Sequence, residues 1–247
     1  MTFHAIKTTL PQILPWRNLF LQETNFQIRY HSCHERGWSD SYLLRIDDDA
    51  IGYGAIKGKE QRSDRDAIFE FYIIPPYRKY SGQLFAQLLA TAGATWIECQ
   101  SNDLLLSAMA YESSQHIRAN TILFGDRHTT FLDLPGTTFR PIREDDKIFE
   151  HKSEPEGSFV LEKKGAVLAT GGFLLHYNMP FADLYMEVRE DARKSGLGGF
   201  LIQELKKACY WSGRVPAARC NIDNAASKAT LLKAGLGICG YMLDCKL

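Results

Sequence analysis

A glycine-rich turn at residues 193–199 is the part of the sequence best suited to bind an anion. It follows a β-type segment and precedes apolar residues spaced as on one face of a helix. Glycines at a helix start let backbone N–H groups approach phosphate oxygens without a Cβ in the way, and the helix dipole adds attraction. The turn therefore predicts a phosphate site, although glycines also serve to pack a helix tightly against a strand.

Acidic residues alternate along the segment before this turn. Strand periodicity puts Asp183, Tyr185 and Glu187 on one face of residues 182–188. A carboxylate beside a bound substrate can accept a proton or anchor an amine, so Glu187 and then Asp183 are candidates for a catalytic base. The alternative is a pair of solvated or salt-bridged strand carboxylates. His176, at the end of the preceding strand, is a further candidate base or else a hydrogen-bonded structural residue.

Two other sets of reactive side chains have simpler interpretations. Cys220 suggests a covalent acyl-cysteine, but no histidine is near it in sequence, and we expect a buried structural thiol. His31, Cys33 and His34 resemble half of a metal site without a second half. We expect a loop there, before Gly37, and no metal.

The composition is that of a soluble globular protein with a substantial core. Of the 247 residues, 45% are hydrophobic and 23% charged, and the length fits one large domain or two small ones. Lys and Arg total 29, as do Asp and Glu, so no overall field attracts nucleic acid or membrane. The six cysteines lack paired spacing, and there is no basic leader followed by an apolar run. We expect a cytoplasmic protein.

The sequence contains two copies of one pattern. Each copy has a hairpin, a strand followed by a glycine-containing basic turn and an amphipathic helix, and a strand that leads into a helix N-cap. The matched segments are 41–54 with 158–171, 68–75 with 182–188, and 96–102 with 218–224. The repetition predicts two βαβ-containing units.

A breaker cluster at 134–136 marks the expected boundary between the copies. An apparent strand at 129–134 precedes it and a new strand at 138–142 follows it, which gives domains 1–136 and 137–247.

The second copy lacks leading helices. A helical stretch at 13–26 precedes the first hairpin, whereas the segment between 142 and 158 is too short and too charged for one. One face of the second sheet then stays open unless the first half covers it.

The second half resembles the GCN5-related N-acetyltransferase (GNAT) family. Arg193, Gly196 and Gly198 match the family's Arg/Gln-x-x-Gly-x-Gly/Ala turn, and Asn224 with Gly235 matches its second motif. Leu236 departs from that motif, because Phe is usual there. The resemblance implies an α/β fold with a mixed sheet, as two tandem GNAT-like units, and acetyl-CoA as co-substrate. The implied reaction is direct attack of an amine, from a small molecule or peptide, on the acetyl thioester.

The resemblance also assigns residues. The implied cofactor-binding residues are Val188, Arg193, Lys194, Ser195, Gly196, Leu197, Gly198, Gly199, Asn224 and Ser227. The backbone N–H near Val188 is the implied oxyanion donor. Leu231 stands where many relatives have the tyrosine that acts as general acid, so Ser227, Tyr241 or water replaces it, or the thiolate leaves unaided. Lys206, Lys207 and Arg214 are candidates to hold the nucleotide's 3′-phosphate, or else surface charges.

The first half resembles a degenerate copy. Its turn at 79–84 keeps Gly82 but has Leu84 where a second small residue belongs, and we expect that side chain to obstruct phosphate binding. The first half is then a scaffold and lid. The alternative function is a non-catalytic acyl-CoA-binding sensor or regulatory module. The expected partner is a small-molecule amine, with no nucleic acid and no membrane; the oligomeric state is not predicted.

Overall fold

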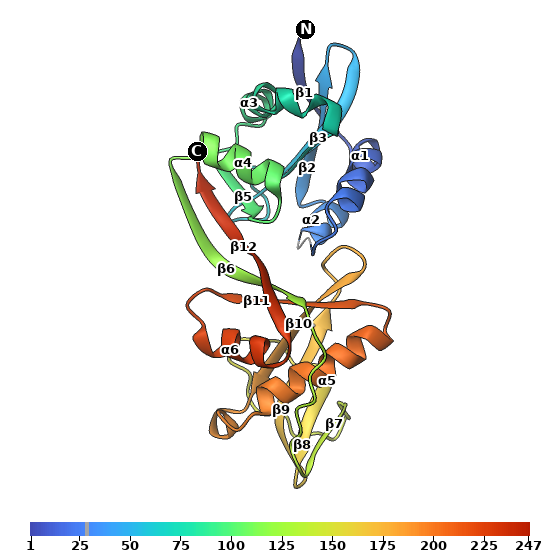
Figure 1. The fold of residues 1–247 in the computed structure, drawn as a ribbon, viewed down its shortest axis with the longest axis vertical. Helices are drawn as coiled ribbons and strands as arrows, with labels where there is room; N and C mark the ends of the chain where they lie inside the picture. Colours follow the sequence, from blue (N-terminus) through green and yellow to red (C-terminus); the bar gives the residue numbers. More distant parts are fainter. Residues whose placement is uncertain (28–29) are drawn as a thin grey trace. The chain divides into compact units, whose positions relative to one another are not determined.

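The computed structural model describes residues 1–27 and 30–247 and divides the chain into two compact units (Figure 1). Unit 1 consists of Met1–Thr121 and Gly240–Leu247, and unit 2 of Ile122–Cys239. Two long strands belong to both: β6 (His116–Asp126) runs from unit 1 into unit 2, and β12 (Leu236–Lys246) runs back. The compact division therefore differs from a single boundary after residue 136.

The two units repeat one order of elements. Unit 1 contains β1 (Phe3–Thr8), α1 (Leu10–Glu23), α2 (His31–Glu35), β2 (Ser39–Ile46), β3 (Asp49–Lys57), β4 (Ala67–Ile73), the 3₁₀ helix η1 (Pro75–Tyr80), α3 (Ser81–Ala92), β5 (Trp96–Gln100) and α4 (Leu104–Ser113). Unit 2 contains β7 (Thr137–Pro141), β8 (Phe159–Lys163), β9 (Ala166–Leu174), β10 (Phe181–Val188), the 3₁₀ helix η2 (Glu190–Ala192), α5 (Leu197–Trp211), β11 (Val215–Asn221) and α6 (Ala225–Lys233). The predicted repeat is confirmed, and the counterparts of α1 and α2 are missing between β7 and β8, a segment that is fully described.

In unit 1, strands β1 to β4 form an antiparallel meander, β5 joins β4 in parallel, and β12 pairs with β5. Helix α3 packs on β1 and β2, whereas α1 contacts β2, β3 and β4 (Figure 1). The apolar residues between α3 and the sheet form a continuous core that includes Phe71, Phe85 and Leu88.

In unit 2, strands β7 to β10 are antiparallel and α5 packs against β8, β9 and β10 (Figure 1). Leu201 and Leu205 of α5 are fully buried. Strand β11 pairs with β10 in parallel only from Phe181 to Leu184. Beyond Leu184, β10 has no strand partner on that side among the described residues.

The predicted strand at 129–134 is wrong. The segment has no sheet partner, because the side chain of Gln203 on α5 takes the place of one. Its Oε1 accepts from the N–H of Leu132 at 2.6 Å, and its Nε2 donates to the Leu132 carbonyl at 3.0 Å. The loop predicted before Gly37 is also wrong: residues 31–35 form α2, whose His34 contacts the buried Glu70 at 2.9 Å.

No helix among the described residues is long and apolar enough to cross a membrane.

Candidate functional site

The glycine turn of unit 2 has the backbone geometry of an anion cradle. Lys194 and Gly196 have left-handed φ angles of 61° and 87°, and Gly196 is the N-cap of α5. No side chain of the described residues caps this helix. Because the first N–H groups of a helix have no intrahelical acceptor, they are available to an anion, which the helix dipole also attracts.

A cavity of about 630 Å³ opens beside this turn. All the predicted cofactor-binding residues except Ser195 line it: Val188, Arg193, Lys194, Gly196, Leu197, Gly198, Gly199, Asn224 and Ser227. The Ser195 hydroxyl is instead hydrogen-bonded to the carbonyl of Ala192. The structure therefore brings both predicted motifs to one cavity.

Two features keep the cavity open to backbone atoms. A Cβ added to Gly198 would lie 3.1 Å from Thr230 and 3.2 Å from the methyl group of Met186, so a larger side chain would fill the space. Asn224 caps α6 by accepting from the N–H of Ser227 at 3.0 Å, which places the start of this second helix on the cavity wall.

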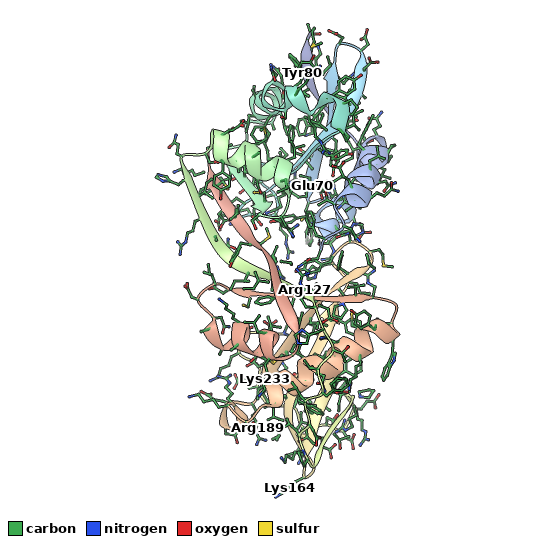
Figure 2. The ribbon with its side chains drawn as sticks, in the orientation of Figure 1. Glu70, Tyr80, Arg127, Lys164, Arg189 and Lys233 are labelled. Carbon is green, nitrogen blue, oxygen red and sulfur yellow. The ribbon has the colours of Figure 1, made fainter. Side chains whose placement is uncertain are left out.

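Three cations line the cavity: Arg193, Lys194 and Lys233. Lys233 ends α6 (Figure 2), and its side chain lies 3.5 Å from where a Cβ on Gly199 would be. No motif in the sequence marks Lys233, since the packing of α6 beside α5 brings it to the turn.

The predicted role of Lys206 in phosphate binding is wrong. Lys206 is buried, lies 2.6 Å from Asp126 and donates to two carbonyls, so its charge is already compensated. Lys207 is paired with Glu204 at 2.6 Å, and neither lysine lines the cavity. Arg214 does not line it either, and its guanidinium lies 3.5 Å from the Tyr177 carbonyl.

The N–H of Val188 points toward the unpaired edge of β10. Arg189 donates to Leu168 on β9 at 2.9 Å, and successive residues of a strand direct their N–H groups to opposite edges. The N–H of Val188 is therefore directed away from β9, to the side where pairing with β11 has already ended at Leu184. An oxyanion donor needs this position.

Glu187 lies on the cavity wall and is 6% exposed. Its carboxylate accepts from the backbone N–H groups of Lys152 at 3.0 Å and of Ser153 and Glu154 at 3.1 Å. Burial raises the pKa of Glu187, but these three donors outweigh burial and hold the pKa below its ordinary value. The carboxylate fastens the loop before β8 to the sheet, and its lowered pKa makes it a weak proton acceptor.

The structure brings Asp183 and His176 together, outside the cavity lining. Asp183 is 4% exposed, and its Oδ2 lies 3.1 Å from both His176 Nε2 and Arg219 Nε. The predicted face of β10 thus exists, with the Glu187 carboxylate at the cavity and the buried Asp183 carboxylate paired with the partly exposed His176 and Arg219.

The loop that crosses this face contains a residue the sequence reasoning missed. Glu154 is an exposed residue that lines the cavity, and partial burial there, followed by the charge of Asp183, raises its pKa. Residues 151–157 lie against the sheet: His151 is hydrogen-bonded to Thr170, and a Cβ on Gly157 would collide with the backbone of Gly171. In the sequence, Glu154 is one acid among many in a charged segment. Its position in the structure depends on its backbone hydrogen bond to Glu187, which is distant in sequence.

Two further side chains were singled out in the sequence. Leu231 is buried and, as a leucine, supplies no hydroxyl for a general acid. Cys220 is also buried and does not line the cavity, and burial raises the pKa of its thiol. A thiol that resists ionisation is a poor nucleophile.

The corresponding turn of unit 1 differs in its backbone. Tyr80 (Figure 2) joins η1 directly to α3, and Gly82 is an ordinary helical residue without a left-handed φ. Leu84 is fully buried within the hydrophobic core of the unit. The expected obstruction by Leu84 is therefore not the main difference between the turns, because unit 1 lacks the left-handed cradle itself.

No family model matches the chain, and no curated protein matches it in sequence. Solved structures do share its fold. An acetyltransferase of the GNAT family from Colwellia psychrerythraea is 13% identical, with a TM-score of 0.75 over 100% of both chains. A GCN5-related N-acetyltransferase from Sphaerobacter thermophilus is 12% identical, with a TM-score of 0.62 over 98% of this chain and 94% of that one.

A tandem GNAT protein from the clavulanic acid biosynthesis pathway is 10% identical, with a TM-score of 0.60 over 98% of this chain and 97% of that one. At these identities the likeness is one of fold. The chain has the tandem GNAT fold, and the predicted fold class is confirmed.

Proposed function

We propose that unit 2 binds acetyl-CoA and transfers its acetyl group to an amine. The observation that carries this proposal is the left-handed turn at Lys194 and Gly196, which presents the start of α5 to a cavity of about 630 Å³. The fit is chemical as well as steric, because the same wall carries three cations and the ligand carries phosphates.

Each part of the cavity has a role in this proposal. The N–H groups from Gly196 to Gly199 hold the pyrophosphate, while Arg193 and Lys233 offset its charge. The bound co-substrate supplies an acetyl thioester. The N–H of Val188 donates to the carbonyl oxygen of that thioester and stabilises the negative charge that develops there.

The predicted base residues take different roles. Glu187 holds the loop at 152–154, and Asp183 with His176 and Arg219 forms an ionic cluster that shapes the acceptor side. Transfer is direct, since Cys220 is away from the cavity wall. Ser227 lines the cavity and is a candidate for the predicted acid. A thiol has a pKa of roughly 8.5, so it is also able to leave as thiolate without an acid.

The second candidate function is acyl-CoA binding without transfer. The observation that favours it is the buried Leu231. Many GNAT relatives have a tyrosine there that acts as the general acid. Transfer to any amine excludes this candidate.

The test is calorimetric titration with acetyl-CoA of the wild type, Gly198→Trp and a matched control, Gly82→Trp. An indole at 198 would fill the space between Met186 and Thr230, whereas a Cβ added to Gly82 would meet no described residue outside its own helix within 4 Å. We expect one site in the wild type and in Gly82→Trp and none in Gly198→Trp. Absence of binding to the wild type, or equal binding by all three proteins, would refute the proposal.

A further inference from the structure

Three carboxylates influence one another on one side of unit 2. Asp183 and Glu187 lie on the same face of β10, and Glu154 comes from the loop that crosses this face. Asp183 and Glu187 both raise the pKa of Glu154, and Arg219 partly opposes them. Glu154 in turn raises the pKa of Tyr185, which lies between the two strand carboxylates. Glu154 and Glu187, the two of these that line the cavity, give it an acidic side, in contrast to the cations of its phosphate-binding turn.

Most carboxylate oxygens of Asp183 and Glu187 already have hydrogen-bond or ion-pair partners. Both oxygens of Glu187 accept backbone hydrogen bonds, and Oδ2 of Asp183 is shared by Arg219 and His176. The side chain of Glu154 makes no hydrogen bond or ion pair with residues 1–27 or 30–247. Within the same residues, Oδ1 of Asp183 is buried without a hydrogen-bond donor.

An uncommitted oxygen on a buried carboxylate is an unusual feature, because burial without a partner is costly. Asp183 does not line the cavity, so it acts on a cation there through its charge. Glu154 also lies on the same cavity wall as Val188, whose N–H is directed at the opening between β10 and β11.

We propose that Glu154 is the catalytic base of unit 2 and that the acceptor is an aliphatic amine, which arrives as an ammonium ion. This inference rests on the proposed function. The Glu154 carboxylate binds the ammonium and takes one of its protons, which leaves a neutral amine. The nitrogen then forms a bond to the thioester carbonyl carbon, the C–S bond breaks, and the sulfur keeps the electron pair. The second proton of the nitrogen passes to the thiolate, and Glu154 releases the first to solvent.

Two properties suit Glu154 to this role better than its neighbours. Its carboxylate is free to turn toward a ligand, whereas Glu187 is fixed by three N–H groups. Its pKa is raised and that of Glu187 is lowered, and a higher pKa makes a carboxylate the stronger base. The charge of Asp183, outside the cavity lining, adds attraction for the same ammonium.

The test compares the full-length wild type with Glu154→Gln and a matched control, Glu156→Gln. Glu156 belongs to the same loop and, like Glu154, is exposed, but it does not line the cavity. Its backbone carbonyl accepts from Tyr185, and its variant removes the same charge as Glu154→Gln. Acetyl-CoA binding is measured by calorimetry. Turnover is measured by release of free thiol, with butylamine and 1,4-diaminobutane as aliphatic acceptors and 4-methylaniline as an acceptor that is neutral at pH 7.5.

We expect all three proteins to bind acetyl-CoA equally. Glu154→Gln should lower kcat/KM for the aliphatic amines by about 100-fold, in the range that general bases contribute, and change the value for 4-methylaniline much less. Glu156→Gln should match the wild type. The inference is overturned if the wild type binds acetyl-CoA but acetylates neither aliphatic amine, or if Glu154→Gln keeps wild-type rates. It is also overturned if Glu154→Gln slows both acceptor classes equally, which indicates a structural role. Failure of the wild type to bind acetyl-CoA would instead refute the function on which the inference rests.

Discussion

The backbone N–H of Glu154 donates to Oε2 of Glu187 at 3.1 Å, so a strand residue fixes a loop residue on the wall of the same cavity. In unit 2 this loop covers part of the sheet, as the leading helix α1 does in unit 1. Residues 151–157 contact β9 and β10, and the buried carboxylate of Glu187 holds them there by hydrogen bonds to backbone N–H groups. The position of the acidic side of the cavity therefore depends on Glu187.

Replacing Glu187 with Gln should loosen the loop. The amide has one oxygen for three N–H donors and places an NH₂ group against the others, so we expect a loss of about 1–3 kcal/mol in the free energy of unfolding. Urea denaturation measures it. The matched control is Glu190→Gln, which breaks only the exposed pair with Lys152 and should change stability by less than about 1 kcal/mol.

The pH dependence of this contribution has a definite sign. Because the folded-state pKa of Glu187 is lowered, its contribution is complete above the ordinary value of 4.5 and is lost as the pH falls through the lowered value. The stability difference between wild type and Glu187→Gln should shrink on acidification. A difference that is constant with pH would contradict this role.

Replacing Arg193 or Lys233 with Ala should weaken acetyl-CoA binding. Each removes one cation from the cavity wall, and we expect a rise in Kd of about 10-fold per variant, which equals about 1.4 kcal/mol. The effect should diminish with added salt. Lys207→Ala on α5 is the control, since Lys207 pairs with Glu204 and does not line the cavity. If Lys207→Ala weakens acetyl-CoA binding as much as Arg193→Ala or Lys233→Ala does, the phosphates are held by long-range attraction and not by direct contact with the cavity wall.

Local backbone requirements made much of this site predictable. Gly196 and Asn224 belong to motifs whose spacing reflects a left-handed turn and a helix cap, and both occupy those positions. Glu154 and Lys233 were missed because their places depend on partners distant in sequence, Glu187 and the neighbouring helix α5. The strand predicted at 129–134 failed for the same reason, since the amide of Gln203 satisfies its backbone.

A matched pair of glycine variants should separate the two turns. Gly196→Ala forces a side chain into φ 87° and should cost about 1–2 kcal/mol of stability and weaken acetyl-CoA binding. Gly82→Ala lies in the first turn of α3 without a left-handed φ and with open space around it, so it should stabilise the fold by up to about 1 kcal/mol. Thermal and urea unfolding check both. Equal effects would mean that the turn of unit 2 is not strained.

The stability of unit 1 should depend on pH through Asp103. It caps α4 by accepting from the N–H of Leu106 at 3.1 Å, and burial raises its pKa to about 7. The folded protein therefore holds this proton more tightly than the unfolded chain, and stability falls as the pH rises from about 4 to 7. Asp103→Asn keeps an oxygen for the cap and carries no charge. It should be more stable than wild type at pH 8, by up to about 4 kcal/mol, with an advantage that shrinks as the pH is lowered to 5. Asp103→Ala, which loses the cap, should be less stable than Asp103→Asn by about 1 kcal/mol at either pH. An advantage of Asp103→Asn that does not change between pH 5 and 8 would show that the buried carboxyl is not the titrating group.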